Sequence, residues 1–102
     1  MEISNSKLQE VKGKFRLQAL KGKIKWSDLF GSDEELILAL KSLDKDKLDF
    51  CINKGYIKGT EYLKSFHKQL NEGKILSAKQ VTMLKRLAVE VSTLSQLMDF
   101  IY

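Results

Sequence analysis

The sequence predicts an all-α protein, a compact bundle of about five or six short helices. Its 102 residues contain no proline, the residue that most readily breaks a helix. Apolar residues recur at steps of three and four along much of the chain, which is the spacing of one helix face. A serine followed three residues later by Glu or Gln, the capping-box pattern, occurs at Ser6, Ser32 and Ser77. With 43% hydrophobic residues, we expect residues 1–102 to form a single small domain.

The first expected helix begins at Ser6 and carries apolar residues at helical steps from Leu8 to Ala19. A small N-terminal β-hairpin over residues 9–26 is the alternative, because apolar and polar residues also alternate there and Gly13 is unfavourable inside a helix. We favour the helix, because it starts at a cap. Both interpretations leave three cations in solvent: Lys12, Lys14 and Arg16.

The next segment contains Trp26, the only tryptophan, ahead of a short helical turn that starts at Ser27. A tryptophan in a small domain is usually a core anchor because of its large apolar area. The functional alternative is a ring that stacks on an unpaired base beside the neighbouring lysines.

Two helices are expected between residues 32 and 55. The first starts at Ser32, and its residues 36–43 are apolar nearly all round, so we expect it to be the central buried helix. The second carries Leu48, Cys51 and Ile52 toward the core and ends near residues 53–55.

The clearest local signals lie in residues 60–91. One helix follows Thr60 and ends before Gly73, and a second starts at the capping box of Ser77 and Gln80 and runs to Val91. The connection is short, so the two helices are expected to pack as a helical hairpin.

A last helix is expected after a kink at residues 92–93. Its apolar stripe either closes the core or forms an interface with another protein or a second copy of the chain. The candidate interface residues are Leu94, Leu97, Met98 and Ile101.

A pattern of apolar, serine and glutamine positions spans the two helices of residues 63–87. Its residues are Leu63, Ser65, Phe66, Gln69, Leu70, Gly73, Leu76, Ser77, Lys79, Gln80, Leu84 and Leu87. The pattern resembles a short helical element of phage-encoded replication and recombination proteins and of the small accessory proteins beside them. The resemblance covers about a quarter of the chain and implies a viral DNA-metabolism setting, without any catalytic residue.

The formal net charge of +5 is unevenly distributed. Residues 1–26 and 51–102 are basic, whereas residues 27–50 are acidic. If the basic parts share a face, they can neutralise the phosphates of nucleic acid without reading its sequence. The candidate residues are Lys12, Lys14, Arg16, Lys21, Lys23, Lys25, Lys79, Lys85 and Arg86.

Catalysis is not expected, because the sequence has no phosphate-binding loop, dinucleotide turn or nucleophile elbow. His67 is the only histidine and Cys51 the only cysteine, so neither a metal cluster nor an internal disulfide is expected. The acidic run Asp33 to Glu35 fits the first turn of a helix better than a metal site, since consecutive side chains point in different directions. We expect no cofactor, no membrane segment and a cytoplasmic location, in the host cytoplasm if the protein is viral.

These observations favour a small accessory protein that binds nucleic acid non-specifically, with DNA as the expected partner. The alternative is an adaptor or inhibitor that binds a host or viral enzyme, or a second copy of itself, through the C-terminal stripe and the hairpin helices.

Overall fold

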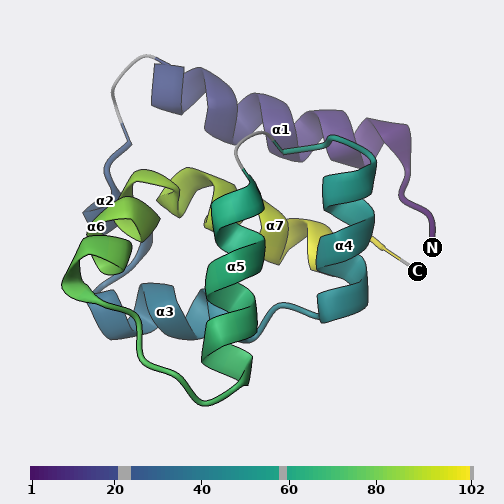
Figure 1. Cartoon of the computed structure of the whole chain (residues 1–102). Helices are drawn as coiled ribbons and strands as arrows, with labels where there is room; N and C mark the ends of the chain where they lie inside the picture. Colours follow the sequence, from purple (N-terminus) through teal and green to yellow (C-terminus); the bar gives the residue numbers. More distant parts are fainter. Residues whose placement is uncertain (21–23, 58–59, 102) are drawn as a thin grey trace.

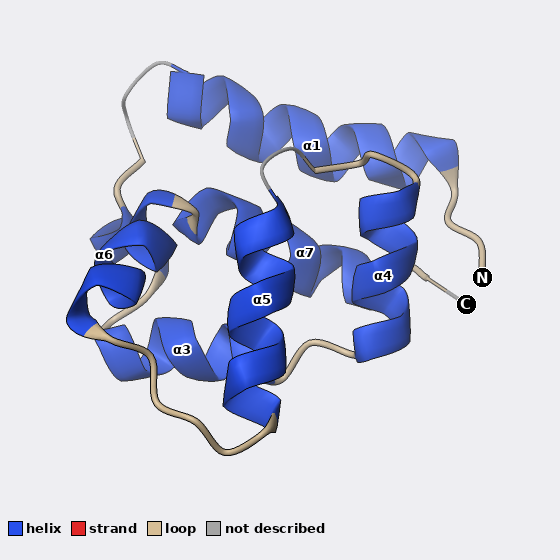
Figure 2. Cartoon of the chain, in the orientation of Figure 1, coloured by secondary structure: helices blue, strands red, loops and turns tan. Residues whose placement is uncertain are grey.

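The described part of the chain is built of helices joined by short loops (Figure 2). The computed structural model describes residues 1–20, 24–57 and 60–101, apart from the side chains of residues 12, 14–20 and 60. Those ranges contain seven helices and no strand, which confirms the all-α fold and excludes the β-hairpin alternative. The helices are α1 (Asn5–Leu20), α2 (Trp26–Leu29), α3 (Asp33–Lys41), α4 (Lys45–Asn53), α5 (Thr60–Asn71), α6 (Ala78–Arg86) and α7 (Ala88–Met98).

Helix α7 is the centre of the bundle, and α1, α2, α3, α4 and α6 all pack on it (Figure 1). The prediction that residues 36–43 form the central helix is therefore wrong. In α3 only Leu36 and Leu40 are buried, while the side chain of Leu38 is 61% exposed. An apolar run shows that a helix has a face to bury, but its neighbours decide how much of it is covered.

The break in the C-terminal part of the chain falls at Leu87, between α6 and α7, and not at the predicted kink. Leu87 has φ −105° and ψ 15°, outside the helical values, and α7 begins at the next residue. Thr93 lies inside α7, where its hydroxyl donates to the Val89 carbonyl at 2.8 Å. Because that bond satisfies the buried hydroxyl within the helix, the threonine does not interrupt it.

Helices α1 and α7 pack side by side and run in opposite directions (Figure 1). Lys7 near the start of α1 has its Nζ 5.5 Å from the centre of the Phe100 ring, just beyond the end of α7. Leu8 and Val11 are buried against the core, as the helical spacing predicts. The helix begins one residue before the predicted cap Ser6, which lies inside its first turn.

The local signals in residues 60–91 are mostly confirmed. Ser77 Oγ accepts from the Gln80 amide at 3.1 Å, and the Gln80 side chain accepts from the Ser77 amide at 2.9 Å. Gly73 has φ 81°, the left-handed conformation that ends α5. The predicted hairpin is wrong, because α5 and α6 each pack more extensively on α3 than on each other.

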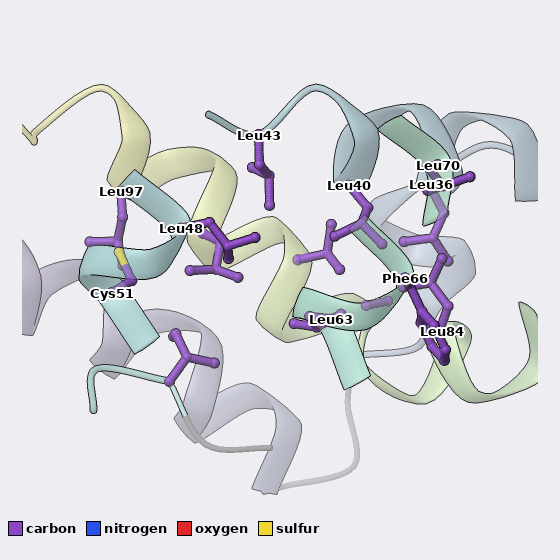
Figure 3. Close-up of a cluster of buried hydrophobic side chains, with 14 of the residues drawn as sticks. Leu36, Leu40, Leu43, Leu48, Cys51, Leu63, Phe66, Leu70, Leu84 and Leu97 are labelled. Atoms are coloured by element: carbon purple, nitrogen blue, oxygen red, sulfur yellow. The ribbon is translucent and has the colours of Figure 1, made fainter. Parts of the chain in front are cut away.

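One cluster of buried side chains joins the helices (Figure 3). Leu36 and Leu40 come from α3, Leu48 and Cys51 from α4, and Leu97 from α7. The radius of gyration of 13.0 Å equals the value of about 13 Å expected for a folded domain of this length.

Candidate functional site

Several predicted cations belong to backbone segments that lie toward one end of the bundle, namely the second half of α1, the residue before α2, and α6 (Figure 1). Because α1 runs antiparallel to α7, its later half points toward the start of α7, where α6 ends (Figure 1). Helix α2 lies beside α6, since the Lys85 ammonium of α6 sits over the Trp26 ring of α2. We call this region the basic end and define it by five positions: Lys12, Lys14, Arg16, Lys25 and Arg86.

Three of the predicted cations with described side chains are exposed. Lys25 and Arg86 are exposed, and so is Lys79, which lies two turns before Arg86 on α6. For Lys12, Lys14 and Arg16 the structure gives the helical backbone only. Lys21 and Lys23 lie outside the described residues.

Lys85 is not a free cation, contrary to its place among the candidate phosphate contacts. Its Nζ lies 3.1 Å from Asp33 Oδ1 and 4.6 Å from the centre of the Trp26 ring. A carboxylate neutralises the charge, and the contact with the ring holds the side chain against α2. Lys85 therefore joins α2, α3 and α6 to one another.

Trp26 is half-buried and packs against the core, as expected for a core anchor. Lys85 occupies one face of its ring. A base that stacked on that face would have to displace the ammonium group from both the ring and Asp33.

Of the two alternatives for the last helix, the structure supports the one in which it closes the core, and the predicted partner interface is wrong. Leu94 and Leu97 are 0% exposed and Ile101 is 4% exposed, while Met98 is half-buried. Side chains buried to this extent contact the protein's own core and cannot meet a partner without unfolding. The apolar composition of the C-terminal segment follows from the central position of α7.

A cleft with a volume of about 450 Å³ lies between α4 and α5. Its residues come from the loop after α3, from the first half of α4, and from α5 with the residue that follows it. They are Leu43, Lys45, Leu48, Asp49, Lys64, His67, Lys68, Asn71 and Glu72. None of the predicted binding residues lies in it.

His67 forms part of the wall of this cleft and is only 6% exposed. Its Nε2 lies 2.8 Å from the Leu43 carbonyl oxygen, and a carbonyl can only accept, so Nε2 carries a proton. Asn71 Nδ2 donates to the His67 carbonyl at 3.0 Å and to the Lys41 carbonyl at 3.3 Å. These bonds tie α5 to the end of α3 and fix one side of the cleft.

The charged groups of the cleft are mostly lysines. Lys45 and Lys68 are exposed, and Lys64 Nζ lies 3.8 Å from Asp49 Oδ1. One feature of the sequence indicates this arrangement: Lys64 and Lys68 are four residues apart on α5 and therefore on the same side of the helix. The opposite wall, from α4, follows only from the fold.

Nothing in the described residues suggests redox or metal chemistry. Cys51 is fully buried, and this burial raises the pKa of its thiol from 9.0 to about 11, so the reactive thiolate is disfavoured. Within the described ranges no three His, Cys, Asp or Glu side chains form a group that could hold a metal ion. Among the same residues, no helix combines the length and apolar character needed to cross a bilayer.

Comparison with known proteins gives a partial similarity. The chain is 32% identical over 59 residues to the pheromone-processing carboxypeptidase KEX1 of Komagataella phaffii and to that of Komagataella pastoris. The match covers 56% of this chain and spans about a tenth of the length of these curated relatives. No family model matches the chain, and no solved structure matches it.

Proposed function

We propose that this protein binds nucleic acid non-specifically, with DNA as the preferred partner, through the basic end. The observation that carries the proposal is the antiparallel packing of α1 on α7, which places the second half of the α1 backbone, with Lys14 and Arg16, at the end of the bundle where Lys25 and Arg86 lie. Cations that share a surface attract phosphates and release counterions, so affinity falls steeply as salt rises. Lys85 is excluded from the set because Asp33 neutralises it.

The resemblance of residues 63–87 to elements of phage replication and recombination proteins supports an accessory role in DNA metabolism. The adaptor alternative loses its main surface, because the α7 stripe is buried. The partial match to a carboxypeptidase does not lead us to propose peptide hydrolysis. Because the match spans only about a tenth of those enzymes, it carries no activity over to this chain.

The test is a titration of fluorescently labelled single- and double-stranded DNA at about 50 mM and about 200 mM salt. We expect binding at the lower salt, with log K falling by roughly 0.9 per phosphate contact for each tenfold rise in salt on double-stranded DNA. Reversing three charges on α1 (Lys12→Glu, Lys14→Glu and Arg16→Glu) should weaken binding by about tenfold or more and flatten the salt dependence.

The matched control reverses three charges outside the basic end (Lys45→Glu, Lys68→Glu and Lys74→Glu). It changes the net charge by the same amount and should retain most of the affinity. Equal losses in the two triple variants would mean that only net charge matters, and the absence of binding at low salt would refute the function itself.

A further inference from the structure

We propose that the α4–α5 cleft is a binding site for a small amphipathic carboxylate, a molecule with an apolar tail and one negative charge. This inference is independent of nucleic-acid binding, because none of the lining residues belongs to the basic end.

The size and the apolar lining of the cleft support a small organic ligand. Its volume of about 450 Å³ lies within the range of roughly 300–1,000 Å³ typical of small-molecule sites. Leu43 and Leu48 lie behind the cleft (Figure 3) but are only 6% and 1% exposed, so the aliphatic stems of the lining lysines supply most of the apolar surface for a tail. Lys45, Lys68 and Glu72 are exposed, which puts the charged groups at the solvent side.

The charge balance of the lining indicates that the head group of the ligand is an anion. Three lysines stand against two carboxylates, so the cleft carries one uncompensated positive charge that a single carboxylate would neutralise. Lys64 already pairs with Asp49 at 3.8 Å, which leaves Lys45 and Lys68 as the cations available to a ligand. Lys45 is also the first residue of α4, where the helix dipole adds positive potential.

Two polar side chains on the α5 side, His67 and Asn71, are already held in place. The bonds from His67 to Leu43 and from Asn71 to the His67 carbonyl hold both side chains against the backbone. A ligand would therefore meet walls that need little ordering, which lowers the entropic cost of binding. A cleft that combines an apolar lining, a cationic rim and fixed walls favours a ligand that is apolar at one end and anionic at the other.

The experiment follows amide resonances of the ¹⁵N-labelled full chain during titration with sodium octanoate. Octylammonium chloride, with the same tail length and the opposite charge, tests the head group, and sodium acetate tests the tail. We expect saturable shifts in residues of α4 and α5 with octanoate at a Kd below about 1 mM. Neither control compound should give saturable shifts there.

Two variants with the same charge change test the site. Lys68→Glu, on the rim, should weaken octanoate binding roughly fivefold or more, because it replaces an attraction by a repulsion. Lys74→Glu changes an exposed lysine outside the lining residues and should leave the affinity within about twofold.

Three results would overturn the proposal: no saturable octanoate shifts in the cleft, equal binding of octylammonium, or equal affinities of the two variants. Each is read from resonances of α4 and α5, so it leaves the DNA-binding test unaffected.

Discussion

Helices α6 and α7 follow one another in the chain, separated only by Leu87, yet they differ in how much of their surface is buried. Both carry apolar residues at helical spacing. In α6 only Leu84 is buried, whereas five residues of α7 are buried, among them Thr93. The difference arises because α7 has neighbours on most sides, while α6 lies at the edge of the bundle (Figure 1).

The comparison teaches that an apolar stripe is not by itself an interaction surface. From the sequence alone, the stripe of Leu94, Leu97 and Ile101 can be mistaken for an interface, but in the folded molecule these side chains are part of the core. The polar side of α6 is what remains at the surface, with Lys79 and Arg86 exposed.

The largest expected effect comes from truncating a side chain of α7. Leu97→Ala should lower the free energy of unfolding by about 2–5 kcal/mol, because it leaves a cavity around a fully buried position. Leu38→Ala removes the same atoms from a side chain that is 61% exposed and should change stability by no more than about 0.5 kcal/mol. Urea denaturation measures both, and similar losses would contradict the central position of α7.

The second prediction concerns Cys51 of α4, which lies in the same buried cluster as the inner face of α7. Its thiol has a pKa of about 11 in the folded protein, above the ordinary value of 9.0, so folding favours the neutral form. The contribution to stability is complete below pH 9 and is lost as the pH rises toward about 11.

The measurement is the free energy of unfolding at several pH values in this window, for the natural chain and for Cys51→Ala. The natural chain should lose more stability than the variant as the pH rises, because the variant has no thiol that ionises on unfolding. Parallel curves for the two proteins would show that the thiol is not desolvated.

The smallest expected effect lies on α6. Lys85→Met removes the ion pair with Asp33 and the charge over Trp26, and should cost less than about 1 kcal/mol because the pair is partly exposed. It should nevertheless change the fluorescence spectrum of Trp26, the only tryptophan. Lys79→Met alters an exposed lysine of the same helix and should leave the spectrum unchanged; equal spectra for both variants would exclude the contact with the ring.

The sequence predicted the features that depend on neighbouring residues in the chain. The capping box of Ser77 and Gln80, the cap at Ser32 and the left-handed Gly73 are all present as expected. They could be predicted because each is a local bond or dihedral preference. The kink predicted at residues 92–93 is absent, because Thr93 satisfies its hydroxyl within the helix.

The candidate sites were less predictable. The sequence identified the cations of α1 and α6 and the lysine before α2, but it did not show that Asp33 from α3 would pair with Lys85. The α4–α5 cleft was missed entirely, because its walls come from segments that are separated by the loop between the two helices.

The sequence by itself determined that this protein is helical, where most of its helices begin and end, and which parts of the chain are basic. These properties depend on local hydrogen bonds, dihedral preferences and composition. Only the tertiary structure decided that α7 is central, that Lys85 is neutralised and that α4 and α5 border a cleft. Burial and charge pairing depend on which distant segments meet, and helical periodicity does not determine which segments these are.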